Sequence, residues 1–309
     1  MNKVLITGIT GFLGSHIAEN LISNNIEVIG LKRKKSDIWR CKEFKNKIEW
    51  VDILEEEPLI NQLCNYSFDT IIHAAWIGVE SNDRNNWNEQ VKNIIFFVDL
   101  LEAAKALKVK KIVFLGSQAE YGEINSKISE HTQTNALNAY AATKLACLEI
   151  LKTFSVSNDI NWIWLRLFSI FGEKENSNWL IPSLVNSMLN SNEMKFTLGE
   201  QKYAYLYVKD YAEIMRKIIL HRIESGIYNI SSNETKTIKS IIEDIKNVIN
   251  PEFILDFGAL DYRLGQSMHM EGDIQKLCSQ IGKIEFSDYN IALQNTLNYY
   301  LNKENYESI

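Results

Sequence analysis

The sequence predicts an α/β protein in which a doubly wound parallel sheet, covered by helices, carries a smaller mixed α/β lobe. Three observations support this fold class. Short apolar runs typical of strands alternate with longer helical patterns through the first half of the chain. The apolar run 4–6 leads directly into a turn with glycines at positions 8, 11 and 14. After Gly172 the alternation gives way to helices mixed with shorter strand-like runs.

The regular alternation occupies the first half of the chain. Its best-defined helix is expected over 87–107, where Val91 and Ile94 belong to an apolar stripe with helical spacing. Asn86 is a suitable N-cap for this helix, with Glu89 three residues further on. Strands are expected at 4–7, 27–31, 48–52, 70–74, 111–115 and 162–167, and further helices at 12–23 and 139–154.

The second half is expected to build most of the smaller lobe. We place a nucleotide-binding domain over 1–170, with segments near 203–230 returning to it, and assign 171–309 mainly to a substrate lobe. Ligands of an open doubly wound sheet bind outside the carboxyl ends of its strands, so the substrate should lie between the lobes. Helices are expected at 181–189, 211–221 and 238–248, and strands at 195–198, 206–208 and 227–230.

Composition excludes several classes of protein. The 309 residues are 46% hydrophobic and 23% charged, as in ordinary soluble globular proteins. A net charge of −6 argues against a nucleic-acid partner. No apolar run reaches the roughly 18 residues of a membrane span, and no signal peptide precedes the first strand. The scattered cysteines and histidines lack disulfide or metal-ligand spacing, so we expect reduced thiols in a cytoplasmic protein and no metal site.

The glycine turn is typical of a dinucleotide-binding site. A strand before it and a helix after it would let the backbone approach a pyrophosphate, with helix N–H groups directed at the negative charge. The alternative is a tight strand–helix turn that binds nothing. The cofactor-binding residues expected here are Gly8, Thr10, Gly11, Phe12, Leu13 and Gly14.

The end of the second strand indicates which dinucleotide binds. An NAD site usually carries Asp or Glu there, for the ribose 2′-hydroxyl. This chain instead has a basic run in which Lys32, Arg33 and Ser36 could hold a 2′-phosphate through charge-assisted hydrogen bonds. We therefore infer NADP(H), although a solvated basic loop also fits the run.

Tyr140 and Lys144 are candidates for proton transfer. They stand four residues apart on the expected helix 139–154 and therefore share one face. An ammonium near a phenol favours the phenolate and makes the tyrosine a useful acid or base. Ser117, at the carboxyl end of a strand, could hydrogen-bond the reacting oxygen. Spacing alone also fits a surface pair, because it recurs at Tyr205 with Lys209 and at Tyr299 with Lys303.

These motifs together resemble the extended short-chain dehydrogenase/reductase family. The resemblance runs from about Lys3 to Gly272 and implies a seven-stranded Rossmann sheet with a small carboxyl-terminal substrate lobe. It implies that Ser117, Tyr140 and Lys144 form the catalytic triad, with Lys144 also binding the nicotinamide ribose. The motifs are Gly8-x-x-Gly11-x-x-Gly14, Ile72-His73-Ala74-Ala75, the segment 116–122 and Tyr140-x-x-x-Lys144.

The same resemblance assigns further cofactor contacts. Ala74 and Ala75 would line the cofactor, and Phe168 would lie beside the nicotinamide. Asp52 and Ile53 would approach the adenine.

The second half resembles the nucleotide-sugar branch of the family. Arg263 matches a position that often holds a diphosphate. Relatives often carry Arg-Asp where this chain has Tyr203-Ala204, and Lys202 is a candidate to replace that phosphate contact. The substrate-binding residues implied by the resemblance are Gln118, Ser169, Leu180, Lys202 and Arg263.

Within that branch the chain is similar to 4-ketohexose reductases of the CDP-abequose and CDP-paratose synthase type. Sugar 4,6-dehydratases carry Asp-Glu where this chain has Gln118-Ala119, so dehydration is not expected. The resemblance implies NADPH-dependent reduction of the 4-keto group of a nucleoside-diphosphate 4-keto-6-deoxy sugar, for surface polysaccharide synthesis. The alternatives are a 4-epimerase with tightly bound cofactor and a non-catalytic NADP(H)-binding regulatory protein.

Helices 87–107 and 139–154 carry extra apolar surface. In family members these two helices often form a four-helix dimer interface, so the resemblance also implies a homodimer.

Overall fold

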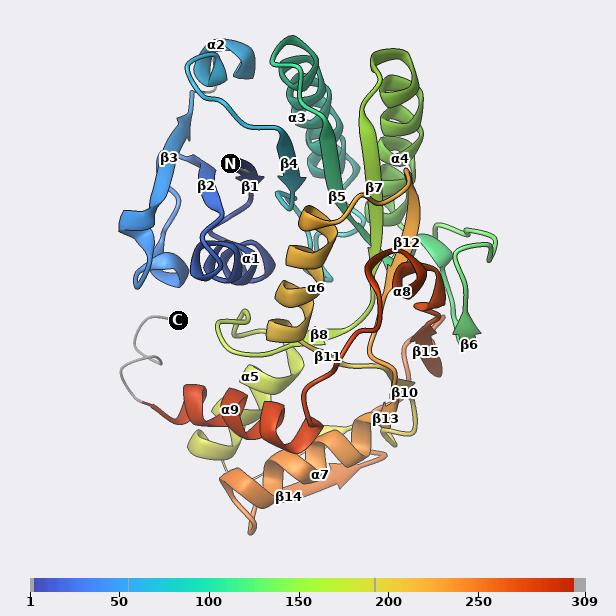
Figure 1. Ribbon diagram of the computed structural model, residues 1–309. Coiled ribbons are helices and arrows are strands. Elements are labelled where there is room, and N and C mark those ends of the chain that lie inside the picture. The colour runs from blue at the N-terminus through green and yellow to red at the C-terminus, as the bar shows by residue number, and fades with distance from the viewer. Residues whose placement is uncertain (1–2, 55, 192, 303–309) are drawn as a thin grey trace.

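The computed structural model describes residues 3–54, 56–191 and 193–302 (Figure 1). Its main feature is a seven-stranded parallel sheet, which confirms the predicted fold class. In spatial order the strands are β12 (Gly226–Ile230), β7 (Asn161–Leu167), β5 (Lys111–Ser117), β4 (Thr70–His73), β1 (Lys3–Thr7), β2 (Glu27–Arg33) and β3 (Ile48–Ile53).

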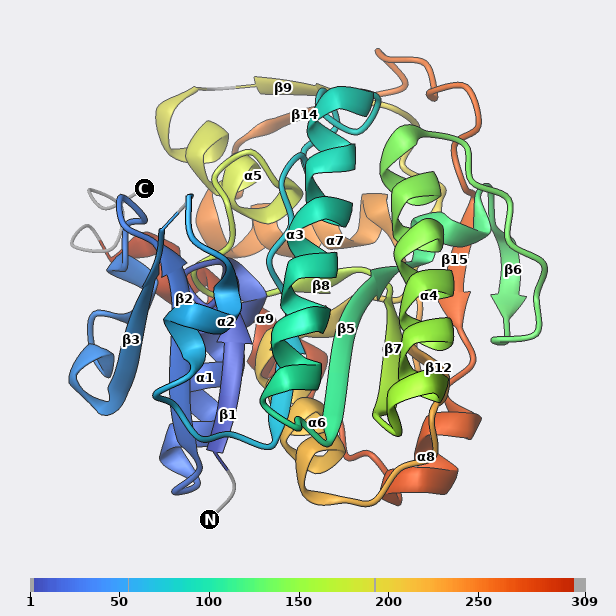
Figure 2. The same ribbon diagram turned by 90° about the horizontal axis from the view of Figure 1, so that it is seen from above.

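Helices cover both faces of this sheet, as Figures 1 and 2 show. On one face, α1 (Phe12–Ser23) packs beside α6 (Val208–Leu220), and their buried residues belong to the larger hydrophobic core. On the other face, α3 (Trp87–Ala106) packs beside α4 (Ala139–Asn158) over a second core. The short helix α2 (Leu59–Leu63) contacts α3. The sheet is therefore doubly wound.

The second half of the chain contributes to both lobes. Strand β12 pairs in parallel with β7 and so forms the edge of the main sheet, while α6 covers one of its faces. Helix α6 begins at Val208, three residues before the predicted start, because the chain turns from the short strand β11 (Leu206–Tyr207) directly into the helix.

The smaller lobe lies on the side of the sheet where the strands end (Figure 1). It contains α5 (Leu180–Asn190), α7 (Ile238–Ile249) and α9 (Tyr289–Leu301), while α8 (Gln275–Ile281) packs against β12. Strand β9 (Glu193–Phe196) pairs with β14 (Ile254–Phe257), and β8 (Ile170–Phe171) pairs with β11. A small sheet has the order β13 (Lys236–Thr237), β10 (Lys202–Tyr203), β15 (His269–Gly272) and β6 (Asn125–Ile128).

Candidate active site

The glycine turn has the geometry of an anion-binding strand–helix junction. Gly8 adopts a φ of +68°, and the N–H of Gly11 donates to the Gly8 carbonyl at 3.0 Å. A Cβ at Gly8 would lie 2.5 Å from the backbone nitrogen of Ala75, and one at Gly14 would lie 2.3 Å from the Gly8 oxygen. Helix α1 starts at Phe12 without a side-chain cap, so its first N–H groups are available to an anion.

A cavity of about 720 Å³ extends from this turn along the ends of β2 and β3 to α3. Phe12, Leu13, Gly14 and Asp52 do not line the cavity; Phe12 and Leu13 pack against the larger core. The predicted cofactor residues that line it are Gly8, Thr10, Gly11, Lys32, Arg33, Ser36, Ile53, Ala74 and Ala75.

The basic run at the end of β2 divides into two different environments. The ammonium of Lys32 forms an ion pair with Asp52 and lies 5.9 Å from the ring centroid of Trp50. Asp52, expected near the adenine, therefore neutralises one of the two cationic residues among the three expected phosphate ligands. Arg33 is exposed, and among the described residues it has no ion-pair partner. Arg33 is thus the stronger candidate for a 2′-phosphate.

The structure brings Ser117, Tyr140 and Lys144 together at the carboxyl end of β5. Asn138 caps α4 by accepting the N–H of Ala141 at 2.9 Å, which places Tyr140 in the first turn. Burial raises the pKa of the Tyr140 phenol, and a hydrogen bond with the Ser117 side chain opposes that rise. The ammonium of Lys144 lies 5.5 Å from the Tyr140 ring centroid.

Lys144 itself is almost fully buried, with 4% of its surface exposed. Its ammonium donates to the Leu115 carbonyl at 2.6 Å and lies 3.8 Å from the ring centroid of Trp76. Burial lowers the pKa of Lys144 to about 7. The indole of Trp76 also meets the Tyr140 ring edge-on at 5.9 Å and donates its N–H to Gln90. Trp76 therefore contacts both members of the Tyr–Lys pair.

A buried ion pair between Glu120 and Arg166 holds the backbone of Ser117 in place. The carboxylate of Glu120 accepts the backbone N–H of Ser117 at 2.8 Å, the Arg166 Nε at 2.8 Å and the Trp164 indole at 3.0 Å. Glu120 is fully buried and Arg166 is 2% exposed. The Ser117 hydroxyl in turn accepts the N–H of Ala119, which completes a capping box. These bonds fix the orientation of Ser117.

The predicted substrate residues lie on several separate segments. Gln118 follows Ser117, Leu180 opens α5, and Lys202 is exposed on β10. The carbonyl of Ser169 accepts the N–H of Leu206 at 2.8 Å and so joins β8 to β11.

Phe168 and Arg263 lie beside Tyr203. Phe168 and Tyr203 pack in one small apolar cluster, and the Tyr203 hydroxyl donates to the Ser267 carbonyl at 3.0 Å. Burial raises the pKa of Tyr203, and a hydrogen bond with Gln266 and the charge of the exposed Arg263 oppose this rise. Tyr203 thus stands beside the predicted diphosphate ligand, at the position where relatives often carry arginine.

The sequence profile of the NAD dependent epimerase/dehydratase family matches residues 4–231. The chain belongs to this family. The match spans the glycine turn, the Ser–Tyr–Lys group and β12, and it confirms the extended short-chain dehydrogenase/reductase assignment made from the motifs.

Relatives in this family match over nearly the whole chain. CDP-abequose synthase of Salmonella muenchen is 28% identical over 289 residues, covering 92% of this chain and 94% of the relative. A dTDP-D-glucose 4,6-dehydratase of Dictyostelium discoideum is 28% identical over 256 residues, covering 75% and 59%. Both relatives are named for nucleoside-diphosphate sugars.

Solved structures of epimerases share the fold. The UDP-N-acetylglucosamine 4-epimerase of Methanobrevibacter ruminantium, in complex with UDP-N-acetylmuramic acid, superposes with a TM-score of 0.86 at 26% identity, covering 98% of this chain and 99% of that one. The UDP-glucose 4-epimerase of Thermotoga maritima gives 0.87 at 20% identity, with coverage of 98% and 99%.

Sequence reasoning missed two residues of the site, Trp76 and Arg84. Trp76 stands next to the predicted Ala74-Ala75 pair, but no periodicity marks it as a partner of Lys144. Arg84 lies in an irregular loop and is placed against Tyr140 only by the tertiary fold. Glu120 belongs to the motif segment 116–122, and its complete burial against Arg166 gives it a structural role.

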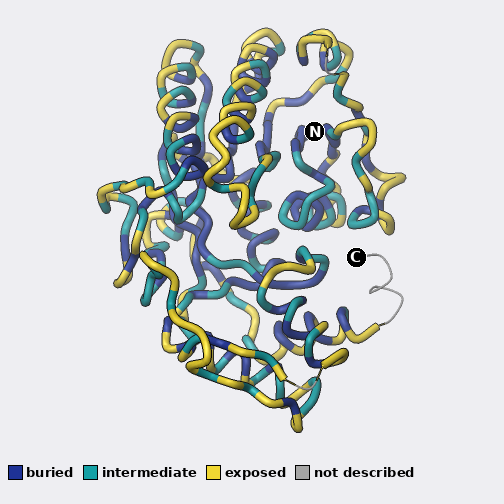
Figure 3. Tube along the Cα trace, turned by 180° about the vertical axis from the view of Figure 1, so that it is seen from behind, coloured by how far each residue is buried: buried dark blue, intermediate teal, exposed yellow. Residues whose placement is uncertain are grey.

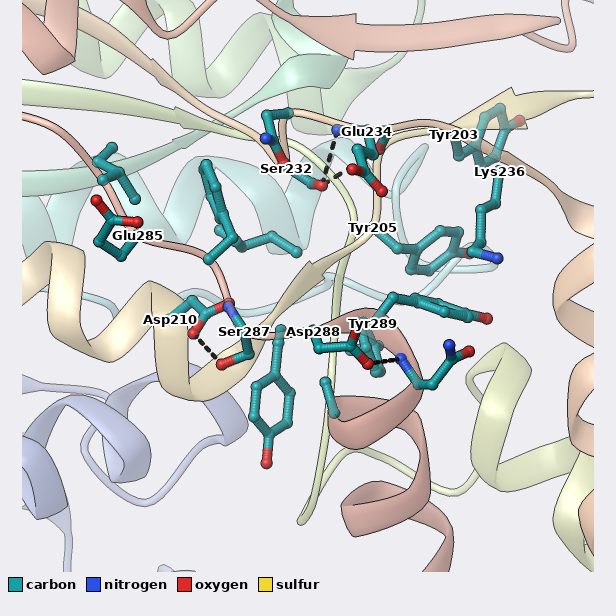
Figure 4. A pocket seen from close by; sticks show the side chains of 18 of the residues that line it. Tyr203, Tyr205, Asp210, Ser232, Glu234, Lys236, Glu285, Ser287, Asp288 and Tyr289 are labelled. Atoms are coloured by element: carbon teal, nitrogen blue, oxygen red, sulfur yellow. Dashed lines mark hydrogen bonds between the residues drawn. The ribbon is translucent and has the colours of Figure 1, made fainter.

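A second cavity, of about 470 Å³, lies where the 203–210, 232–236 and 283–290 segments meet (Figure 4). Tyr205, Tyr289 and Lys236 gather at one end of it, and Asp210 and Ser287 are hydrogen-bonded at the other. None of the predicted site residues lines this cavity.

The residues that the structure describes contain neither a metal-ligand cluster nor a membrane-spanning helix. No group of three or more His, Cys, Asp or Glu side chains there is arranged to hold a metal ion. No helix in the same residues has the length and apolar character needed to span a bilayer. Of Tyr299 and Lys303, which share the i, i+4 spacing of Tyr140 and Lys144, only Tyr299 belongs to the described residues.

Proposed function

We propose that the chain is an NADPH-dependent reductase of the 4-keto group of a nucleoside-diphosphate 4-keto-6-deoxy sugar. The observation that carries this proposal is the grouping of Ser117, Tyr140 and Lys144 at the carboxyl end of β5, with Trp76 joining Lys144 to a glycine-lined cavity. The similarity to CDP-abequose synthase supports a product sugar for surface polysaccharides.

NADP(H) is the proposed cofactor. The absence of an acidic residue at the end of β2, with Arg33 exposed in the cavity lining, supports a 2′-phosphate over a free 2′-hydroxyl. The glycine turn fits the pyrophosphate, because the first N–H groups of α1 have no side-chain cap and face the turn that lines the cavity. Bound NADPH would supply the hydride that reduces the sugar carbonyl at C4.

The residues of the chain supply the proton and the orientation. Ser117 hydrogen-bonds the carbonyl oxygen of the sugar and holds it near the Tyr140 phenol. Tyr140 gives its proton to this oxygen as the carbonyl becomes an alcohol, and is left as a phenolate. Lys144 binds the nicotinamide ribose and favours that phenolate through its positive charge. The sum is one ketone, one NADPH and one proton converted to one alcohol and NADP⁺.

A 4-epimerase is the second candidate, because solved epimerases superpose on nearly the full length of the chain. An epimerase oxidises and reduces the same carbon, so it consumes no cofactor. The absence of the ribose-binding acid and the similarity to CDP-abequose synthase favour net reduction instead.

The proposal is tested by following NADPH absorbance with a panel of nucleoside-diphosphate 4-keto-6-deoxy sugars. We expect absorbance to fall with at least one of these sugars, and Tyr140→Phe to abolish nearly all of that rate. Tyr66→Phe, which removes a phenol outside the site, serves as the matched control. Full activity in Tyr140→Phe would eliminate the mechanism. Binding of NADPH without turnover of any sugar would favour a regulatory protein.

We also propose that the chain forms a homodimer through α3 and α4. Exposed apolar residues follow one stripe of α3, with exposed fractions of 59% at Trp87, 45% at Val91, 67% at Ile95 and 42% at Val98. Figure 3 shows exposed residues along the outer sides of both helices. Light scattering should report a dimer for the wild type and a monomer for Ile95→Asp, with Leu220→Asp on α6 as the control. A monomeric wild type would refute this interface.

A further inference from the structure

The loop between β4 and α3 places a second cation against the Tyr140 ring. The guanidinium carbon of Arg84 lies 5.1 Å from the ring centroid of Tyr140. The Nε of Arg84 donates to the Val79 carbonyl at 2.9 Å, and the Arg84 carbonyl accepts the Tyr140 N–H at 2.8 Å. Both the side chain and the backbone of Arg84 are therefore fixed relative to the start of α4.

Lys144 holds its charge less firmly than Arg84. Its ammonium is directed to the Leu115 carbonyl and the face of Trp76, and burial lowers the pKa of Lys144 to about 7. A lysine with that pKa is partly neutral near neutral pH, whereas an arginine side chain stays protonated. Of the two cations near the phenol, Arg84 is the permanent one.

The groups that face Tyr140 come from four segments. Ser117 lies at the end of β5 and Glu120 follows it, Lys144 lies one turn along α4, and Arg84 and Trp76 belong to the loop after β4. The Ser117 bond and the Arg84 charge lower the pKa of Tyr140, while burial and the Glu120 charge raise it. Arg166, paired with Glu120, offsets the charge of that carboxylate.

We propose that Arg84 is a positioning residue for proton transfer, a fixed cation that stabilises the Tyr140 phenolate left when the phenol proton moves to the substrate. This inference rests on the proposed role of Tyr140 as the proton donor. In the step, the Tyr140 O–H bond breaks, the proton joins the substrate oxygen, and the negative charge that remains on the phenol is balanced by the neighbouring guanidinium. An opposite charge near an ionisable group favours its ionised form, and the Arg84 charge acts on the Tyr140 phenol in this direction.

The test is a direct titration of the Tyr140 phenol. The tyrosinate ultraviolet absorbance of Tyr140→Phe is subtracted from that of the wild type, and the same subtraction is made in the Arg84→Met background. We expect the phenol to titrate about one pH unit higher without the guanidinium. Arg84→Lys should restore most of the shift, and Arg222→Met, an exposed arginine elsewhere, should leave the titration unchanged. This readout needs no substrate, so it stands apart from the identity of the sugar.

Arg84→Gln separates the loss of charge from a loss of loop structure, because the glutamine amide can still donate to the Val79 carbonyl. It should show the same upward shift as Arg84→Met. If both neutral variants titrate like the wild type while thermal stability falls, Arg84 only secures the loop and the inference is wrong. With an active sugar, the loss of reduction at high pH should move upward by the same amount and kcat should fall more than KM rises.

Discussion

Two groups of charges lie near the carboxyl ends of β5 and β2, which β4 and β1 separate in the sheet, and their environments are opposite. Next to Ser117, the carboxylate of Glu120 forms an ion pair with the guanidinium of Arg166. Glu120 is 0% exposed and Arg166 is 2% exposed. At the end of β2, Arg33 is exposed and Lys32 pairs with a half-exposed Asp52. The first group fixes the position of the Ser117 hydroxyl, which we propose to be catalytic, and the second is proposed to present charge to the cofactor.

This difference sets how each group responds to change. Charges in a low-dielectric interior interact strongly, and removing one partner leaves the other both desolvated and unpaired. Exposed charges are screened by salt, and single pairs among them contribute little to stability. Substitutions of Glu120 or Arg166 should therefore affect folding, whereas substitutions of Lys32 or Arg33 should affect cofactor choice.

The largest effect is expected for the buried pair. Glu120→Gln leaves Arg166 without its counter-charge and should lower the free energy of unfolding by about 3–5 kcal/mol. The double variant Glu120→Gln/Arg166→Met should recover much of this loss. Urea unfolding measures both. Glu149→Gln, which breaks an exposed pair with Lys152, should change stability by less than about 1 kcal/mol. Equal effects of Glu120→Gln and Glu149→Gln would remove the contrast between the two environments.

Lys144 should make stability depend on pH in the alkaline range. Burial lowers the pKa of Lys144 to about 7, below the roughly 10.4 of a lysine in the unfolded chain. Between these values the unfolded state binds more protons, so stability rises with pH. Below about pH 7 the wild type bears the cost of the buried charge, so Lys144→Met should gain most in stability relative to the wild type there. This relative gain should shrink toward pH 10. Denaturant unfolding without cofactor checks this. Parallel stability curves would show that Lys144 is not desolvated as described.

The smallest effect is expected for Arg33. Arg33→Ser should lower the preference for NADPH over NADH by about tenfold, because one charge-assisted hydrogen bond to a 2′-phosphate is lost. The effect should weaken in high salt. Kinetics with both cofactors measure the preference, and Lys45→Ser, another exposed cation, is the control. A wild type that prefers NADH would overturn the assignment of NADP(H).

The sequence was most informative where structure is local. Helix α1 was predicted at its observed bounds, because a glycine turn and one helical stripe define it. Strand β2 runs two residues further than predicted, since Lys32 and Arg33 pair with Asp52 and Ile53 of β3, which local propensity does not reveal. Strand β6 was missed because it pairs with β15, far along the chain.

The candidate site follows the same division. Tyr140 and Lys144 were found because i, i+4 spacing on a helix guarantees a shared face. Trp76 and Arg84 were missed because they lie in an irregular loop far from Tyr140 and Lys144 in the sequence. Only tertiary packing brings them into contact. The pairing of Lys32 with Asp52 was also hidden, since it depends on the register of β2 against β3.

Net reduction at sugar C4 is tested most directly by tracing hydrogen from the cofactor. NADPH carrying deuterium on the transferred position of nicotinamide C4 is incubated with the enzyme and an accepted 4-keto-6-deoxy sugar nucleotide. The account predicts one deuterium at C4 of each product molecule and one NADP⁺ formed with it. An unlabelled product with an inverted C4, formed without loss of added NADPH, would contradict the account and identify an epimerase.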